Sequence, residues 1–69
     1  MVEVFKTNVQ NHSDAERLVA ELSKKNSILK INFDLNDCDN VLRIEAKKIN
    51  PLEIIELMNS KGFQCEVIL

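Results

Sequence analysis

The sequence is poor in the residues on which many small proteins depend. Of its 69 residues, two are cysteine, one is histidine, and the three aromatic residues are all phenylalanine. Two cysteines are too few for the disulfide framework of a small secreted domain. Three phenylalanines offer little surface for stacking on bases, and nine basic against eleven acidic residues leave no excess positive charge for a phosphate backbone. We therefore expect neither a disulfide-rich domain nor a protein that binds nucleic acid.

Long apolar runs and targeting signals are also missing. No apolar stretch approaches the roughly 18 residues that a membrane-spanning helix needs. The first six residues contain no basic region leading into an apolar one, so they do not resemble a signal peptide. We therefore expect a cytoplasmic protein that has no contact with a membrane.

The composition that remains is typical of one small folded domain. Hydrophobic residues make up 45% of the chain and charged residues 29%, with a net charge of −2, and this balance excludes intrinsic disorder. A chain this short buries only about 60% of its unfolded surface, so most of its apolar residues must serve one core. Because no repeat or linker interrupts the pattern, we expect residues 1–69 to form a single domain.

Two periodicities divide the chain into strands and helices. Alternation of apolar and polar residues, as in Leu29–Leu35, predicts strands, whereas apolar spacing of three and four residues predicts helices. The first helix is expected to begin with Ser13 as N-cap, in a capping box with Glu16, and the second with Asn50 as N-cap and Pro51 behind it. The expected elements are strand 2–9, helix 13–25, strands 29–35 and 41–46, helix 50–61 and strand 63–69.

The order β-α-β-β-α-β predicts an α+β fold, the ferredoxin-like sandwich, in which two helices cover one face of a four-stranded antiparallel sheet. In this fold the first strand lies between the third and the fourth. Alternation places Leu29 on the inward face of its strand, and helical spacing places Leu52, Ile55 and Met58 in the buried stripe of the second helix. The first loop, the hairpin turn and the last loop should meet at one end of the sheet.

That end gathers the candidate site residues, which suit a small ion site or a partner site. Each has an ordinary explanation too, since a histidine is often solvated in a loop and a carboxylate is stabilised at a helix start. Cys38 and Cys65 should lie roughly 10–14 Å apart across the sheet, too far for a disulfide. With one histidine and no glycine-rich loop, we expect no enzyme. The candidates are Asn11, His12 and Asp14 in the first loop, Cys38 in the hairpin, and Lys61 and Phe63 in the last loop.

Three stretches resemble small bacterial heavy-metal-associated domains. They are Phe5–Gln10 with the helix that follows, the hairpin segments Phe33–Asp37 and Val41–Glu45, and Pro51–Phe63 with its Gly-Phe loop. The resemblance implies the fold just described. It also implies a soft-metal site, because these copper chaperones and related modules hold metal with a C-x-x-C pair in the first loop.

In this sequence the two cysteine positions of the family fall at Asn11 and Asp14. Soft ions such as Cu(I) select thiolates, which neither an amide nor a carboxylate replaces. We therefore expect a degenerate domain with no cofactor, which acts as an interaction module. By the resemblance, its partner is another protein domain, bound through Asn11, His12, Asp14, Lys61 and Phe63.

Two alternatives use other chemistry. In one, the protein is a metallochaperone with altered ligands, in which His12, Asp14 and Cys38 bind an ion such as zinc or copper. In the other, Cys38 forms an intermolecular disulfide under oxidation. The open face of the sheet carries Val4, Val41 and Ile68, a stripe that is either cross-strand packing or the seam of a weak homodimer. The expected oligomeric state is thus a monomer or a weak homodimer.

Overall fold

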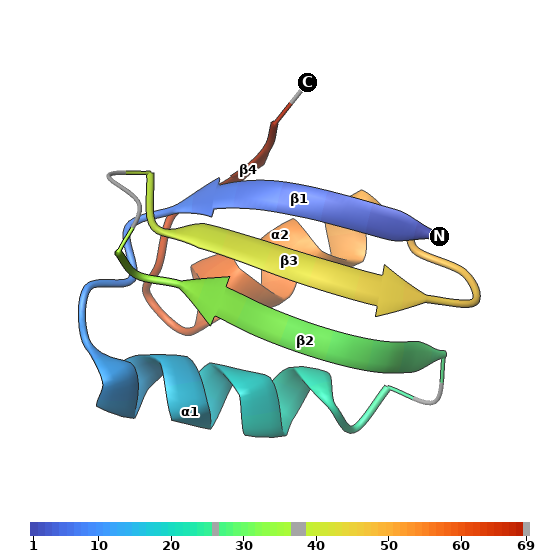
Figure 1. Ribbon diagram of the computed structural model, residues 1–69, viewed down its shortest axis with the longest axis horizontal. Coiled ribbons are helices and arrows are strands. Elements are labelled where there is room, and N and C mark those ends of the chain that lie inside the picture. The colour runs from blue at the N-terminus through green and yellow to red at the C-terminus, as the bar shows by residue number, and fades with distance from the viewer. Residues whose placement is uncertain (26, 37–38, 69) are drawn as a thin grey trace.

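The structure is a computed structural model of residues 1–69 that describes residues 1–25, 27–36 and 39–68. Its elements follow the predicted β-α-β-β-α-β order (Figure 1). They are β1 (Val2–Thr7), α1 (His12–Leu22), β2 (Ile28–Asp34), β3 (Val41–Ala46), α2 (Pro51–Ser60) and β4 (Cys65–Val67).

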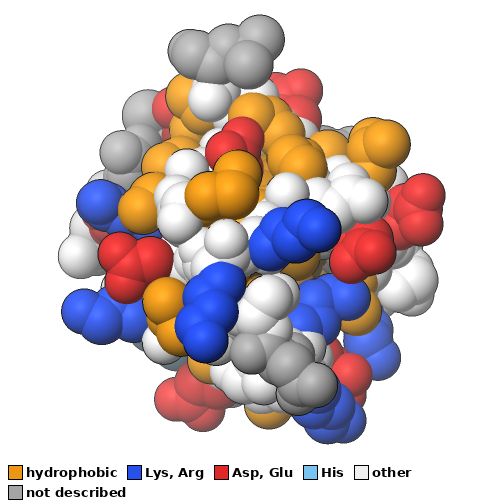
Figure 2. Space-filling view, turned by 90° about the vertical axis from the view of Figure 1, so that its right-hand side faces the viewer, with side chains coloured by type: hydrophobic (Ala, Val, Ile, Leu, Met, Phe, Trp, Pro, Cys, Tyr) orange, Lys and Arg blue, Asp and Glu red, His pale blue; other side chains and the backbone are white. Residues whose placement is uncertain are grey.

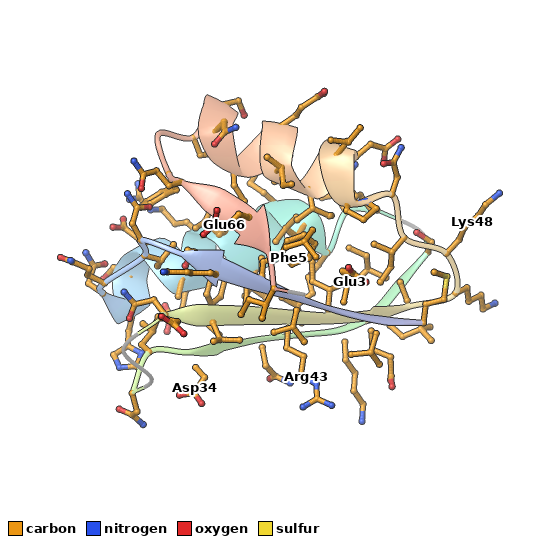
Figure 3. The ribbon with its side chains drawn as sticks, turned by 90° about the horizontal axis from the view of Figure 1, so that it is seen from above. Glu3, Phe5, Asp34, Arg43, Lys48 and Glu66 are labelled. Atoms are coloured by element: carbon orange, nitrogen blue, oxygen red, sulfur yellow. The ribbon has the colours of Figure 1, made fainter. Side chains whose placement is uncertain are left out.

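The four strands form one antiparallel sheet in the order β2-β3-β1-β4. Seen from above, both helices lie on one side of this sheet, and the labelled side chains of Asp34 and Arg43 project from the other (Figure 3). This arrangement confirms the predicted ferredoxin-like sandwich. None of the helices in the described part of the chain is long and apolar enough to cross a membrane.

The core fills the space between the sheet and the two helices. Alternate residues of β1 and β3 point inward, so that Phe5 faces Leu42 across the sheet, and Phe33 of β2 faces Leu42 from the other side. Each helix adds residues spaced three or four apart, as expected for one buried face. The buried apolar residues are Phe5, Val9, Ala15, Leu18, Leu22, Leu42, Ile44, Ala46, Ile54 and Met58.

A β-bulge in β2 overturns one prediction about the core. Ile28 faces Ala46 and Lys30 faces Glu45, so Leu29 is an extra residue on the β2 side of the ladder. Ile28 therefore packs against the core, and the side chain of Leu29 is 57% exposed. The expected inward position of Leu29 was wrong because strict alternation assumes a ladder without such an insertion.

The second helix begins as predicted but buries a different face. Asn50 is the N-cap, its Oδ1 accepts a hydrogen bond from the Leu52 N–H at 3.1 Å, and Pro51 follows in the first turn. Ile54 and Met58, four residues apart, are buried, while Leu52 is 66% exposed. Leu52 precedes Ile54 by two residues, or about 200° around the helix, so the two cannot share a face. The prediction for Leu52 was wrong.

Helix α1 and strand β4 are also shorter than predicted. Helix α1 ends at Leu22 with Ser23 as C-cap, so Lys24 and Lys25 lie beyond it rather than in its last turn. Lys25 instead reaches Glu53 of α2, with Nζ to Oε2 at 3.6 Å. Strand β4 is shorter than the predicted 63–69, and Leu69 lies outside the described residues.

Hydrogen bonds of Thr7 and Asn8 connect the end of β1 to the hairpin turn and to the last loop. The buried Thr7 hydroxyl donates to the Asn40 carbonyl at 2.6 Å and accepts from the Val9 N–H at 3.3 Å. Asn40 has a positive φ of 47°, which asparagine tolerates in turns. Asn8 Oδ1 accepts from the Gln64 N–H at 2.8 Å. These bonds confirm that the first loop, the hairpin turn and the last loop meet at one end.

We predict that Thr7→Val destabilises the protein more than Thr7→Ser. Valine preserves the shape but leaves the Val9 N–H and the Asn40 carbonyl without this partner, which costs about 1–3 kcal/mol of unfolding free energy. Serine keeps the hydroxyl and loses one methyl group, a loss of about 1 kcal/mol. Urea unfolding followed by circular dichroism measures both. If Thr7→Val is as stable as Thr7→Ser, the hydroxyl does not fasten the turn.

Candidate functional site

The first loop ends in a reciprocal pair of hydrogen bonds between Asn11 and Asp14. Asn11 is the N-cap of α1, in an extended conformation, and its Oδ1 accepts from the Asp14 N–H at 2.8 Å. Its Nδ2 donates to Asp14 Oδ2 at 2.9 Å. The N-cap thus lies two residues before the predicted one, and the prediction of Ser13 as N-cap was wrong. Asn-x-x-Asp has the same spacing as the expected Ser-x-x-Glu box and takes its place.

The Asp14 carboxylate is engaged on both oxygens. Besides the bond from Asn11, the Arg17 guanidinium, one turn further along α1, donates to Oδ1. A carboxylate in the first turn is also favoured by the positive end of the helix dipole. Both positions where the resemblance would have a thiolate are therefore occupied by a local network that stabilises the helix start.

Asp14 also borders a hollow of about 280 Å³ between α1 and the last loop. The last loop borders this hollow through Lys61 and Phe63. Between them, Gly62 follows the end of α2 with a φ of +92°, a conformation that residues with a side chain rarely adopt. Phe63 then turns back, and its N–H donates to the Met58 carbonyl at 3.0 Å. Among its lining residues, Leu18 is buried and Phe63 half-buried, whereas the charged Arg17 and Lys61 are exposed. Its lining residues are Asp14, Arg17, Leu18, Ala20, Glu21, Lys61 and Phe63.

His12 lies on a different side of α1. It borders a second hollow, between α1 and β2, together with Glu16 and Phe33. The structure thus brings Asp14, Lys61 and Phe63 around one hollow but places His12 beside another. Cys38, the remaining candidate, lies outside the described residues. Across residues 1–25, 27–36 and 39–68, no group of three or more His, Cys, Asp or Glu side chains is placed to hold a metal ion.

Cys65 is the cysteine that the structure describes, and it is a poor nucleophile. It faces Thr7 across the β1–β4 ladder and packs against the core, as its inward position predicted. Burial, and secondarily the charge of Glu66, raises the pKa of the Cys65 thiol from 9.0 to about 11. The thiol therefore stays protonated at neutral pH, whereas metal binding and nucleophilic attack require the thiolate.

The open face of the sheet and the opposite end of the molecule have mixed surfaces. On the open face, Val4 lies opposite Arg43, and Val41 lies opposite Lys6. Ile68 is exposed and continues the β4 edge with a hydrogen bond from its N–H to the Val4 carbonyl at 2.9 Å. The end opposite the first loop shows hydrophobic, basic and acidic side chains intermingled (Figure 2).

Comparisons with known proteins place the fold among copper-binding domains. No protein-family model matches the chain, and no curated protein matches it. The yeast copper transporter domain Ccc2a, solved in apo and Cu(I)-loaded states, is 14% identical with a TM-score of 0.85 over 99% of this chain and 94% of that one. The Atx1–Cu(I)–Ccc2a complex gives 14% identity and a TM-score of 0.84, over 99% and 94%.

A third structure, a copper-binding domain from HMA7, a P-type ATPase, is 15% identical with a TM-score of 0.81, over 99% of this chain and 93% of that one. At such identities the similarity shows the fold alone. The chain has the ferredoxin-like fold of copper-binding heavy-metal-associated domains.

We predict that Asn11→Ala lowers the free energy of unfolding by about 1 kcal/mol, because the Asp14 N–H and carboxylate lose their reciprocal partner. Asn11→Ser should cost less, since serine at an N-cap still offers an oxygen to that N–H. Thermal and urea unfolding measure the difference. Equal stability of the alanine variant and the unaltered protein would contradict a capping role.

We predict that the Cys65 thiol of a Cys38→Ser variant ionises with a midpoint near pH 11. The ultraviolet absorbance of the thiolate, recorded as a function of pH, measures this midpoint. The same variant in denaturant should ionise near the ordinary thiol value. Because the folded state holds this proton to higher pH, the thiol's contribution to stability is complete below pH 9 and is lost as the pH rises toward 11. A folded-state midpoint near 9 would contradict the assigned burial.

Proposed function

We propose that residues 1–69 form one heavy-metal-associated-like domain that acts in the cytoplasm as a non-catalytic interaction module. In this proposal the domain has lost tight binding of soft metals at its first loop. The observation that carries the proposal is the reciprocal Asn11–Asp14 pair, which gives the two cysteine positions of the resemblance a capping role.

Ligand chemistry supports the loss of soft-metal binding. Cu(I) prefers soft sulfur ligands, whereas Asn11 and Asp14 offer only oxygen and a neutral amide nitrogen. A cation there would also compete with the Asn11 amide and the Arg17 guanidinium, which already donate to the carboxylate. The thiol of Cys65 does not replace the missing ligands, because it faces the core and stays protonated.

The partner in this proposal is another protein domain. One of the similar structures is a complex of Atx1 with Ccc2a and Cu(I), so the same fold takes part in an assembly of two proteins there. In this chain the docking surface would be the first-loop end. Its hollow of about 280 Å³ combines apolar lining residues with charges of both signs, which suits a side chain of a partner. The proposed contact residues are Asn11, His12, Asp14, Lys61 and Phe63.

The alternative function is a metal-ion carrier that uses His12, Asp14 and Cys38 for zinc or copper. A borderline ion needs three or more ligands that converge on one point. His12 and Asp14 border different hollows, so convergence would require rearrangement of the first turn of α1. This arrangement favours the interaction module.

The test is an anaerobic Cu(I) titration against a chromogenic Cu(I) chelator. We expect the unaltered protein to withdraw no copper from the chelator. The variant Asn11→Cys/Asp14→Cys should withdraw one equivalent, because the start of α1 places these two positions side by side. A second pair of titrations repeats the experiment with Cys38→Ser added to both proteins. The difference between the two pairs measures the contribution of Cys38.

Two results would contradict the proposal. If the unaltered protein binds one equivalent and loses it on His12→Ala or Cys38→Ser, the carrier function is correct. If the double cysteine variant folds but takes no copper, Asn11 and Asp14 are not the positions of the metal pair. Amide spectra of the same samples, in the presence of Zn²⁺ as well as Cu(I), locate any site.

A further inference from the structure

Strand β2 presents a regular, unpaired edge at one border of the sheet. In the described part of the chain it pairs with β3 alone. The regular part runs from Lys30 to Asp34, because the bulge lies before it, and after it the chain turns with Asp34 Oδ1 accepting from the Asn36 N–H at 3.1 Å. Every second residue of such an edge directs its backbone N–H and carbonyl away from the sheet, where another strand can pair with them.

A hollow of about 290 Å³ lies directly beside this edge, on the helix side. Helix α1 runs along β2 (Figure 1). Its residues form the opposite wall of the hollow. The lining comes from both elements: Ala15 and Val19 on the helix and Ile31 and Phe33 on the strand are apolar, whereas His12, Glu16 and Asn32 are polar. An added strand would project alternate side chains into this hollow, opposite Ile31 and Phe33. An unpaired edge with an apolar groove beside it is the arrangement in which strand addition binds extended peptides.

Charges at the two ends of the edge specify the segment that fits. Lys30 and Asp34 are exposed on the open face with Asn32 between them. In an antiparallel pair, directly opposed residues share a face, and opposite charges there are stabilising. The complementary segment therefore carries a basic residue opposite Asp34, a polar residue opposite Asn32 and an acidic residue opposite Lys30. Apolar residues stand between them.

We propose that the β2 edge and the adjoining hollow bind an extended segment of a partner protein, which adds antiparallel to β2 with the pattern basic-apolar-polar-apolar-acidic. The same charges would match β2 of a second copy. A second copy is therefore the competing occupant, and the experiment below distinguishes it from a free segment. This hollow differs from the Asp14–Phe63 hollow, although His12, one of the contact residues proposed for the first-loop end, borders it. The proposal does not depend on the docking proposed there.

The test is an amide-resolved titration of the full chain with a capped synthetic peptide, Ser-Lys-Val-Thr-Val-Glu-Ser. We expect saturable shifts confined to Lys30–Asp34 and the facing residues of α1. The charge-exchanged peptide, Ser-Glu-Val-Thr-Val-Lys-Ser, should bind about tenfold more weakly, because both cross-strand pairs become repulsive. The variant Lys30→Glu/Asp34→Lys should reverse this preference, which a merely structural role for the two charges would not do.

A second pair of variants tests the hollow. Val19→Lys places a charge in its wall and should abolish binding while circular dichroism remains unchanged. Leu52→Lys, on the exposed face of α2, is the matched control and should bind normally. The proposal is overturned if neither peptide gives saturable shifts, if the shifts fall on β4 or on the β1 and β3 residues of the open face, or if the charge-exchanged peptide binds better. It is also overturned if the β2 amides shift on dilution without peptide, which would identify a second copy as the occupant.

Discussion

The position of β1 between β3 and β4 is the constraint on which the rest of the structure depends. Both of its neighbours come from later in the chain, so the backbone of β1 is paired only when contacts between residues distant in the sequence have formed. Once paired, Phe5 is fully buried, and Thr7 and Asn8 fasten the hairpin turn and the last loop to the end of the strand. A chain of 69 residues has a thin core, and this one shared strand therefore orders both the core and the end that carries the candidate site.

The start of α1 is stabilised by hydrogen bonds among its own polar side chains. An N-cap needs an acceptor for the backbone N–H three residues on, and Asn11 supplies it to Asp14. The side chains then bond each other and Arg17, so the polar groups at this helix start satisfy one another. What this pair contributes to the chain is helix stability and a charged rim beside Phe63. That is consistent with the proposed role in recognition rather than in metal transfer.

Helix α1 borders two hollows, one on each of two sides, and their lining residues differ in chemistry. One border faces the last loop and has rim charges of both signs around Leu18 and Phe63. The other faces β2, where a hollow lined by apolar and polar side chains lies beside a strand edge that has no partner in the described part of the chain. A surface of the first kind suits a folded domain with complementary side chains, and one of the second kind suits an extended segment. The two proposals thus assign two different binding surfaces to one small domain.

The sequence by itself determined the element order, the sheet topology and most of the core. Those features follow from hydrophobic periodicity and from turn and capping residues such as Asn50, Pro51 and Gly62, which act locally. Three details required the tertiary structure. The bulge that exposes Leu29 arises from pairing with β3, and the burial of Ile54 rather than Leu52 arises from how α2 lies on the sheet. Asn11-x-x-Asp14 and Ser13-x-x-Glu16 have the spacing of a capping box alike. The local pattern therefore could not decide that Asn11, and not Ser13, is the N-cap.

The candidate site was likewise predicted from the sequence only in part. Sequence placed Asp14, Lys61 and Phe63 at one end, because the topology fixes where loops meet. It did not find Arg17 or Leu18, which enter the same hollow through the rotation of α1, nor the separation of His12 from Asp14. Helix rotation is set by the packing of the whole apolar face against the sheet. For that reason the sequence determined which residues are near the site, and only the tertiary structure decided which of them share a surface.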